Sequence, residues 1–311
     1  MALRNSHEKM MMPDTTRYDL IGLAEILWDC FPERRLPGGA PANVAYQARQ
    51  LGLRSAVATR VGTDDLGQEL LRFLESKELS TELVQRDPLH HTGTVTVELK
   101  SGGASYIFLE NSAWDFLEVE ETWSAAARRA RTICFGTLAQ RSEVSRRAIH
   151  QLISLAAEDC LVTYDVNLRP PFFEREWIHE SLQRARIVKL NDEEVRVLSA
   201  MFDTKTRTDD EFARWLLSHY GNEVVCITRG AKGAMAVTRD ELCEVAGVAV
   251  KVVDTVGAGD AFTAALIWSR LQGWPLDRSL VLANRLGALV ASRPGAMPEF
   301  QDELHELLSQ S

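Results

Sequence analysis

The stretch VVDTVGAGDAF, residues 252–262, places a glycine, an alanine and a second glycine directly before an aspartate. An apolar run precedes it, and the sequence DAFTAALIWSRLQG that follows has apolar residues at helical spacing, so we expect a strand over 250–255, a turn and a helix. Gly257, Ala258 and Gly259 therefore lead into a helix N-terminus. Free backbone N–H groups and the positive end of the helix dipole make such a turn an anion site, and glycines let the anion approach the backbone.

Asp260 lies in the first turn of this expected helix. A carboxylate there is ordinary helix-capping chemistry. Alternatively, the turn holds a transferring phosphoryl group while Asp260 accepts the proton of the attacking hydroxyl, because phosphoryl transfer needs positioning, charge neutralisation and a base. An aspartate of ordinary pKa, about 3.9, would accept that proton late in the reaction. The patterns GxGxxG and GxxxxGK[ST] are absent here, which argues against dinucleotide and Walker sites. The spacing alone leaves both interpretations open.

The composition is that of an ordinary globular protein. The 311 residues are 45% hydrophobic and 25% charged, which suits one large α/β domain or two small ones. A formal charge of −9 disfavours nucleic acid as the main partner. The five cysteines show neither a disulfide framework nor zinc-site spacing, and no run of 18 apolar residues predicts a membrane span. We expect a cytoplasmic protein with a loose N-terminal tail over residues 1–16.

Short apolar runs alternate with helical stretches along the chain. YDLIGLAEILW (18–28) predicts a strand, ANVAYQARQLG (42–52) a helix that ends at Gly52, and SAVATRVG (55–62) another strand. This alternation is typical of parallel strands joined by right-handed helical crossovers. The same pattern predicts strands at 132–138, 161–168, 186–191 and 223–230 and helices at 143–157 and 174–185.

One segment departs from this pattern. TVTVELKSGGASYIFLE (94–110) has apolar residues alternating with polar ones, then SGG, then a second strand, which predicts a β-hairpin with one apolar face. Such a hairpin does not belong inside a parallel sheet, so we expect a flap or lid. The substrate, a second subunit or the hairpin's own domain could cover the apolar face. Further short strands are expected at 233–238, 241–247 and 250–255.

Two long segments resemble the signatures of a known family. DTVGAGDAF (254–262) resembles the C-terminal signature of the ribokinase-like, or PfkB, sugar kinases, and PGGAPANVA (37–45) resembles their N-terminal signature. The resemblance is closest to bacterial fructokinase-like members. It continues in family order through EILWDCFP (25–32), RVGTDDLG (60–67), YDVNLRPPFF (164–173), KLNDEEV (189–195), TRGAKG (228–233) and ANRLGALVASRPGAMP (283–298).

The resemblance implies a fold and a division of the chain. It implies a ribokinase-like three-layer α/β/α domain over residues 17–311, with a mainly parallel central sheet and a small β-lid built from segments at about 29–37 and 90–110. One departure from the family pattern is that Ala24 precedes Glu25, where the fructokinase-like opening has Gly-Glu. That departure weakens any detailed assignment of the substrate.

The resemblance also implies catalytic roles. Asp260 would be the general base, and the N–H groups around Gly257, Ala258 and Gly259 would stabilise charge on the γ-phosphoryl group. Arg169 would clamp nucleotide phosphates through its planar fork of donors. Taken alone, an arginine before two prolines is equally a solvated side chain.

The sugar-binding residues follow from the same comparison. Asp29, at the expected C-terminal end of the first strand, would accept hydrogen bonds from sugar hydroxyls. Gly38, Gly39 and Asn43 match the sugar-contacting signature, and Asn167 lies just past a strand end. The alternatives are an exposed turn acid for Asp29 and a helix opening for Asn43.

The resemblance assigns the metal sites to two short elements. Asn191 and Glu194 match an N-x-x-E element that organises Mg²⁺ and its waters, with Glu194 acting through water. Asp254 and Thr255 match positions that in many relatives help to hold a monovalent cation, usually K⁺. For both pairs, helix-start or turn capping is the alternative.

The nucleotide-side positions are Thr228, Gly230 and Gly233, which resemble the family's nucleotide loop, and Asn284, in a helix that flanks the adenine in relatives. The implied cofactors are therefore ATP, Mg²⁺ and K⁺. The implied partner is a small-molecule sugar rather than a nucleic acid or a membrane, and analogy with relatives suggests a homodimer formed through the lid.

We therefore expect an ATP-dependent kinase of a sugar primary hydroxyl, with fructose as the leading substrate. 2-Keto-3-deoxygluconate, another sugar or a nucleoside remain alternatives: Arg34, Arg35 and Lys100 are available for a keto acid, and Tyr106 and Phe108 for a base. A catalytically silent sugar-binding regulator is an alternative from another class, which the intact phosphate-binding residues disfavour.

Overall fold

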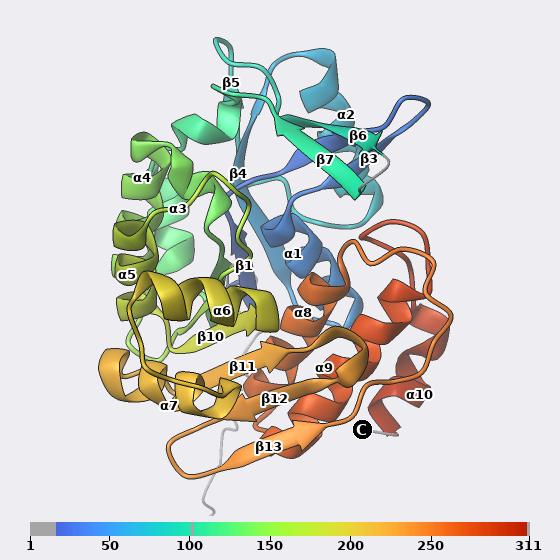
Figure 1. Cartoon of the computed structure of the whole chain (residues 1–311). Helices are drawn as coiled ribbons and strands as arrows, with labels where there is room; N and C mark the ends of the chain where they lie inside the picture. Colours follow the sequence, from blue (N-terminus) through green and yellow to red (C-terminus); the bar gives the residue numbers. More distant parts are fainter. Residues whose placement is uncertain (1–16, 101–102, 310–311) are drawn as a thin grey trace, which may run out of the picture.

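The structure is a computed structural model that describes residues 17–100 and 103–309. The predicted tail over residues 1–16 lies outside the described residues. A central nine-stranded sheet has the order β13-β12-β11-β10-β9-β8-β1-β4-β5 (Figure 1). Neighbouring strands pair in parallel, except that β12 pairs antiparallel with both β11 and β13. Their bounds are β1 Leu20–Leu23, β4 Ser55–Gly62, β5 Val84–Asp87, β8 Thr132–Phe135, β9 Leu161–Asp165, β10 Ile187–Asn191, β11 Val224–Thr228, β12 Ala234–Val237 and β13 Leu242–Val245.

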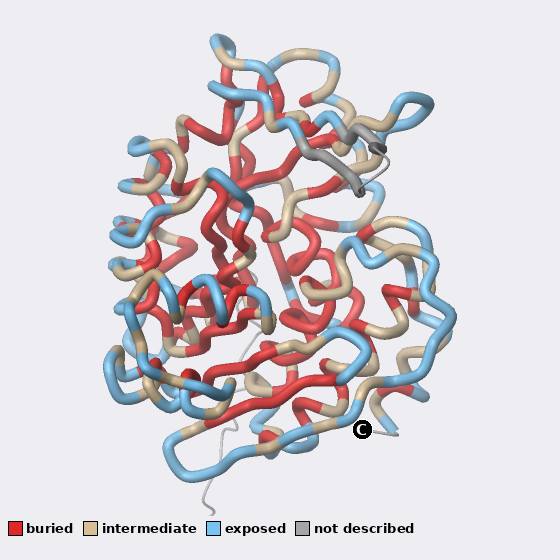
Figure 2. Tube along the Cα trace, in the orientation of Figure 1, coloured by how far each residue is buried: buried red, intermediate tan, exposed pale blue. Residues whose placement is uncertain are grey.

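Helices cover both faces of this sheet, so the predicted three-layer α/β/α architecture is confirmed. Buried side chains of α3, α4, α5, α6 and α7 pack against one face, and those of α1, α2, α8, α9 and α10 against the other. Figure 2 shows the buried strands between these layers. The helix bounds are α1 Ala40–Gln50, α2 Asp65–Ser76, α3 Glu121–Ala127, α4 Glu143–Ser154, α5 Arg175–Arg184, α6 Asp192–Met201, α7 Asp209–Tyr220, α8 Ala258–Leu271, α9 Leu276–Ala291 and α10 Leu304–Ser309.

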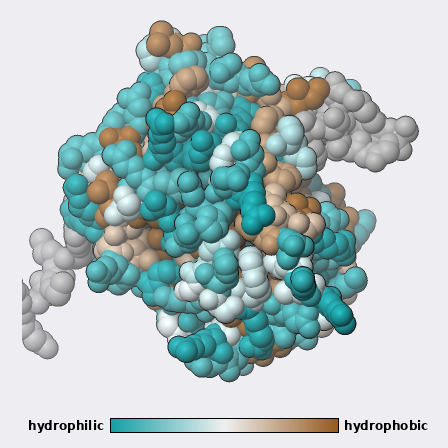
Figure 3. All heavy atoms as spheres, turned by 60° about the vertical axis from the view of Figure 1, so that its left-hand side comes forward, coloured by the Kyte–Doolittle hydropathy of each residue, from teal (hydrophilic) through white to brown (hydrophobic). Residues whose placement is uncertain are grey.

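The outer helices are amphipathic, as their sequence pattern predicts. In α4, Ile149 and Leu152 are fully buried while Val144 and Arg147 face solvent. The corresponding outer face, which carries the helices on the left of Figure 1, is mainly hydrophilic (Figure 3). The hydrophobic effect therefore holds these helices to the sheet along one stripe each.

A second, smaller sheet has the order β3-β2-β6-β7, with β2 Leu27–Cys30, β3 Arg35–Gly38, β6 Thr94–Lys100 and β7 Gly103–Phe108. β6 and β7 form the predicted hairpin, and β6 pairs in parallel with β2. The two segments predicted for the lid thus form one sheet. Residues 101–102 and the side chains of 97–106 are outside the described parts, so the predicted apolar face is not described.

The prediction of one strand over 18–28 was wrong. β1 ends at Leu23, β2 begins at Leu27, and the two strands lie in different sheets. Ala24 has a φ of 139°, and its N–H donates to the carbonyl oxygen of Ala58, so the backbone turns where the apolar run continues. Both halves of the run are buried, and for that reason hydrophobicity could not reveal the break.

The expected strand over 250–255 is also absent from the described residues. Val252 and Val253 are more than half exposed, and neither of the two sheets in the described residues includes this segment. Instead, the N–H groups of Val253 and Asp254 donate to the carbonyl oxygen of Ala291 at the end of α9. The turn that follows still leads into α8, as predicted.

Candidate active site

The glycine-rich turn forms the N-terminus of α8. Gly257 is the N-cap residue with a φ of 78°, and a Cβ atom there would lie 2.6 Å from the Cα of Ala296. The N–H of Ala261 is the first to donate back to Gly257 within the helix, at 2.8 Å. Before it, the N–H of Ala258 makes a long hydrogen bond of 3.3 Å to the carbonyl oxygen of Thr255, and the other N–H groups of the turn lie where a helix supplies no acceptor, so the turn fits an anion. The close approach and the positive φ both require glycine at 257.

Asp260 is buried in the first turn of α8. The side-chain amide of Asn43 donates a hydrogen bond of 2.7 Å to its Oδ2 atom. Burial, reinforced by the charge of Asp165, raises the pKa of Asp260 to about 6, against the opposing effects of Asn43, Lys189 and Arg169. The structure thereby brings the two sequence signatures together, because Asn43 and Asp260 are 217 residues apart along the chain.

A buried ion pair that the sequence analysis missed lies beside this turn. Lys189 Nζ is 3.1 and 3.2 Å from the two carboxylate oxygens of Asp165. The hydroxyl of Thr263 in α8 donates to the same carboxylate at 2.8 Å. A Cβ atom on Gly259 would lie 3.0 Å from Lys189 Nζ, so the ammonium borders the helix start. Asp165 and Lys189 are register partners on neighbouring strands, and opposite charges inside two apolar runs were the available signal.

Asp29 does not lie where the sequence analysis expected it. It belongs to β2 of the small sheet rather than to the C-terminal end of a central strand. A Cβ atom on Gly38 would lie 2.5 Å from Asp29 Oδ2, so the glycine leaves room for the carboxylate. Burial raises the pKa of Asp29 to about 6, the nearby Arg169 opposes this, and Asp254 and Asp260 add to it. These mutual charge effects indicate that Asp29 faces the same region as Asp260.

Glu25 is a second carboxyl group that the sequence analysis left without a role. Its side chain is buried, and its Oε2 atom has no hydrogen-bond partner within the described part of the chain. Burial raises the pKa of Glu25 to about 7, and the charges of Arg169 and Asp260 act on it in opposite directions. The turn at Gly39 packs on this segment, because a Cβ atom at Gly39 would lie 2.6 Å from the carbonyl oxygen of Glu25.

Asn167 and Arg169 follow β9, as predicted. Asn167 adopts a positive φ of 38°, and Arg169 is exposed, with Nη1 donating to the carbonyl oxygen of Leu168. The pKa values of Asp29 and Asp260 are both raised by burial, and the positive charge of Arg169 opposes that rise in each case. The guanidinium is therefore close to the acids of the site and still free to turn toward solvent.

Asn191 and Glu194 form a reciprocal cap at the start of α6. Asn191 Oδ1 accepts from the N–H of Glu194 at 2.9 Å, and Glu194 Oε2 accepts from the N–H of Asn191 at 2.8 Å. Glu194 Oε1 accepts from the N–H of Leu168 at 2.8 Å. Asn191 Oδ1 also accepts from the N–H of Glu193 at 3.0 Å, which occupies both of its lone pairs, whereas each carboxylate oxygen of Glu194 keeps acceptor capacity. Glu194 therefore fits Mg²⁺ held through water, with Asn191 capping the turn that presents it. Among the described residues, no group of three His, Cys, Asp or Glu side chains could hold a metal ion directly.

Asp254 and Thr255 cap the turn before α8. The carboxylate of Asp254 accepts from the N–H of Val256 at 3.0 Å and from that of Gly295 at 3.1 Å. The carbonyl oxygen of Thr255 accepts from the N–H of Ala258. The capping alternative is therefore realised, and binding of a monovalent cation by these residues stays a prediction.

The nucleotide-side residues lie at the end of β11 and on α9. Gly230 and Gly233 have positive φ values of 54° and 95°, and a Cβ atom at Gly233 would collide with the carbonyl oxygen of Val245. Asn284 Nδ2 donates to the carbonyl oxygen of Ala246 at 2.8 Å. The loop around Gly233 and helix α9 therefore both contact residues 245–246. Thr228 ends β11, beside this loop.

The sequence profile described as "pfkB family carbohydrate kinase" matches residues 8–303. The chain belongs to this family of carbohydrate kinases. Over 293 residues it is 32% identical to the fructokinase of Escherichia coli, which covers 88% of this chain and 94% of that protein. The predictions of the family and of a carbohydrate kinase are confirmed.

Solved structures of sugar kinases share the fold. An uncharacterised sugar kinase of Pyrococcus horikoshii in complex with ATP has a TM-score of 0.80 at 27% identity, covering 93% of this chain and 100% of its own. The fructokinase of Vibrio cholerae O395, in its fructose, ADP and calcium ion bound form, has a TM-score of 0.79 at 27% identity, covering 94% and 98%. The predicted ribokinase-like fold is confirmed. In the part of the kinase that the structure describes, every helix is too short or too polar to cross a membrane.

Proposed function

We propose that this kinase transfers the γ-phosphoryl group of ATP to a primary hydroxyl of a sugar, with fructose as the leading substrate and Asp260 as the base. The observation that carries the proposal is the hydrogen bond of 2.7 Å from Asn43 to Asp260. This hydrogen bond joins the N-terminal signature at 37–45, to which the family resemblance assigns sugar contact, with the C-terminal signature at 254–262, to which it assigns phosphoryl transfer. A hydroxyl held near Asn43 would therefore lie beside the carboxylate and the anion-binding turn.

The chemistry needs a proton acceptor and charge stabilisation. The sugar oxygen attacks the γ-phosphorus, its proton passes to Asp260, and the bond from phosphorus to the bridging oxygen breaks to release ADP. With a pKa of about 6, Asp260 is a better matched acceptor near neutral pH than an ordinary aspartate. The N–H groups of Gly257, Ala258 and Gly259 would stabilise the developing phosphoryl charge.

The remaining residue roles are proposed from the place of each residue in the family signatures. Asp29 would accept hydrogen bonds from sugar hydroxyls, with Gly38, Gly39 and Asn167 shaping the pocket. Arg169 would clamp phosphates, and Thr228, Gly230, Gly233 and Asn284 would border the nucleotide. The small sheet of β3, β2, β6 and β7 would act as the lid that excludes water.

Two metal ions belong to the proposal. Mg²⁺ would neutralise phosphate charge, held through water by Glu194 on the turn that Asn191 caps. K⁺ would bind near Asp254 and Thr255, beside the anion turn. Removing divalent cations with a chelator should abolish turnover, whereas replacing K⁺ by Na⁺ should lower it without abolishing it, because the Asp254 cap holds the turn with backbone bonds alone.

Fructose is favoured because relatives at about one-third identity are named fructokinase and one related structure contains fructose. The alternatives are 2-keto-3-deoxygluconate, another sugar, a nucleoside, or sugar binding without catalysis. A homodimer through the lid remains a prediction from the family analogy, and a cytoplasmic location remains a prediction from the sequence pattern.

The deciding experiment measures ADP release by the purified protein with ATP, Mg²⁺ and K⁺ across ketoses, aldoses, keto-deoxy acids and nucleosides. We expect saturable turnover with fructose well above that with the other compounds. Faster turnover on another class would replace fructose. If no compound of the panel supports ADP release, but sugar binding is still detectable as a thermal shift, the regulatory alternative is favoured.

A further inference from the structure

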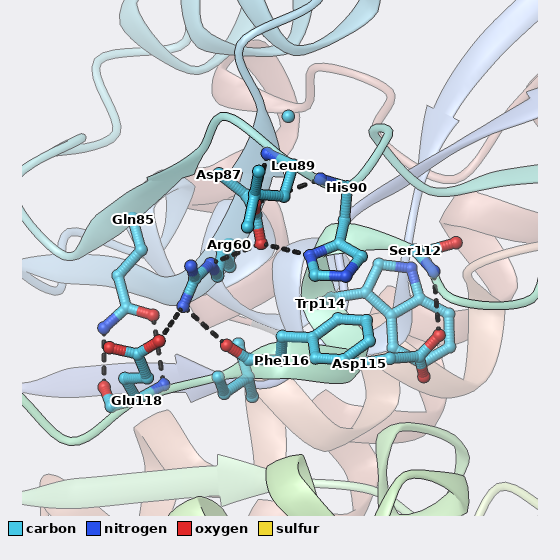
Figure 4. A network of polar contacts seen from close by, with 12 residues as sticks. Arg60, Gln85, Asp87, Leu89, His90, Ser112, Trp114, Asp115, Phe116 and Glu118 are labelled. Atoms are coloured by element: carbon cyan, nitrogen blue, oxygen red, sulfur yellow. Dashed lines mark hydrogen bonds and ion pairs between the residues drawn. The ribbon is translucent and has the colours of Figure 1, made fainter.

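A polar cluster outside the reaction centre joins the two connections of the β6–β7 hairpin to the central sheet (Figure 4). The chain enters the hairpin through residues 88–93, after β5, and leaves it through residues 109–118. We call Arg60, Asp87 and His90 the hairpin anchor. Asp87 ends β5, Arg60 lies in β4, and His90 belongs to the incoming connection.

Asp87 is the centre of the anchor. Its side chain is fully buried, and its Oδ1 atom accepts from the N–H groups of Leu89 and His90 at 2.8 and 3.0 Å. Its Oδ2 atom lies 2.9 Å from His90 Nδ1 and 2.8 Å from Arg60 Nε. All four contacts are made by side-chain atoms of Asp87, so the pairing of β5 with β4 does not require an aspartate there.

Arg60 and His90 extend the anchor to the outgoing connection. Arg60 Nη1 donates to the carbonyl oxygen of Phe116 and to Glu118 Oε1, each at 2.7 Å. The His90 ring stacks on the Phe116 ring, with centroids 3.6 Å apart and planes 12° apart (Figure 4). One buried carboxylate thus links the two connections of the hairpin: it contacts His90 in the incoming one, and Arg60 and the His90 ring carry the link to Phe116 and Glu118 in the outgoing one.

The position of Asp29 depends on the strand that this anchor holds. The N–H of Trp28 donates to the carbonyl oxygen of Gly93, and Asp29 is the register partner of Val95. β6 is therefore the neighbour that flanks β2 on the side opposite β3. A shift of β6 relative to the central sheet would move Asp29 relative to Asp260.

We propose that Asp87 is a positioning residue for the sugar: through Arg60 and His90 it fixes β6, and β6 fixes Asp29 over the reaction centre. The proposal rests on the proposed function for its effect on catalysis, while its structural half concerns the hairpin alone. Two further acids hold these connections separately: Asp64 accepts from the N–H of Thr92 in the incoming connection, and Asp115 in the outgoing connection pairs with Arg141. Neither is a partner of Arg60 or His90 in the contacts described for the anchor, so the Asp87 variant tests the anchor with these contacts in place.

The test compares Asp87→Asn with the matched control Glu118→Gln in the full chain. Glu118 is the other acidic partner of Arg60, but its side chain is largely exposed and Gln85 holds its backbone, so its variant should behave as wild type. In Asp87→Asn, amide hydrogen exchange in residues 94–100 and 103–108 should accelerate about tenfold or more relative to α8. The KM for the sugar should rise about tenfold, with the KM for ATP and kcat within about twofold of wild type.

A loosened lid should also admit water. Asp87→Asn should therefore raise ATP hydrolysis in the absence of sugar, as a fraction of the coupled rate. Should Asp87→Asn fail to fold, His90→Ala removes the ring contact while leaving the pair of Asp87 with Arg60, and the same acceleration of exchange is expected on a smaller scale.

The possible outcomes distinguish a failure of the hairpin anchor from a failure of the proposed function. Unchanged exchange in both hairpin strands would overturn the anchor, whatever the enzyme does. Faster exchange with an unchanged KM for sugar and no added hydrolysis would also overturn it, because the hairpin would then not position the sugar. A wild-type protein inactive on every substrate would instead refute the proposed function, and the exchange result would still decide the anchor's structural role.

Discussion

The two ends of the proposed active site carry similar carboxylates on very different supports. Burial raises the pKa of both Asp29 and Asp260 to about 6. Asp260 stands on α8, whose neighbouring residues Ala261 and Ala264 are fully buried against the core. Asp29 stands on a four-residue strand in a small sheet. The comparison teaches that the proposed phosphoryl end is fixed by the core, whereas the proposed sugar end is held by a small sheet outside it.

The largest expected effect is at the phosphoryl end. Asp260→Asn should lower kcat about a thousandfold, because the amide cannot accept the hydroxyl proton. The folded state should not lose stability, since an amide can accept the hydrogen bond from Asn43 and carries no buried charge. Coupled ADP release and thermal unfolding measure the two quantities. Near wild-type turnover would remove Asp260 from the mechanism.

The rigidity of that end can be tested at its two glycines. Gly257→Ala should destabilise the protein by about 3 kcal/mol, because its φ is positive and the added Cβ would lie 2.6 Å from a backbone atom of Ala296. Gly259→Ala should cost less, about 1 to 2 kcal/mol, since its Cβ would meet the end of one side chain, the buried Lys189 ammonium at 3.0 Å, rather than backbone. Urea unfolding of both variants gives the comparison. Equal losses would mean that the turn is not held by the contact at 296.

At the sugar end, binding should suffer more than chemistry. Asp29→Asn should raise the KM for the sugar about thirtyfold while changing kcat less than about threefold, because one amide oxygen replaces two acceptors. Initial rates at varied sugar and fixed saturating ATP separate the two constants. A fall in kcat as large as that of Asp260→Asn would erase the distinction between the two ends.

The smallest effect concerns stability and pH. The folded pKa of Asp29, about 6, lies above its ordinary value, so its contribution to stability is full at low pH and is lost as pH rises through about 6. Asp29→Asn should therefore raise the melting temperature at pH 8 by about 2 to 4 °C, and this gain should vanish at pH 4. Melting curves at both pH values test the sign. A variant less stable at pH 8 would show that Arg169 outweighs burial.

The same comparison explains what sequence could predict. Local patterns identified β4 with its observed bounds, the β6–β7 hairpin and the start of α8, since periodicity and turn chemistry decide these elements. Matched signatures identified the family, and the structure joins their two residues Asn43 and Asp260. These features depend on neighbours in the chain or on whole motifs.

The failures have a different cause. The break at Ala24 and the unpaired segment at 250–255 depend on which strands are available as neighbours, which no local pattern contains. The pair of Asp165 with Lys189 was missed because it depends on the register between two strands. Glu25 was missed because the charged groups that act on it, among them Arg169 and Asp260, come from distant parts of the chain.

The short connection between β1 and β2 has a consequence for engineering. Only Ala24, Glu25 and Ile26 separate a central strand from the strand that bears Asp29. The small sheet is assembled from two distant parts of the chain, and one of them is continuous with the core. It cannot be exchanged between relatives as a cassette inserted at one loop. Under the proposed function, a graft that aims to change sugar preference must replace residues 24–39 and the hairpin together and preserve the turn at Ala24.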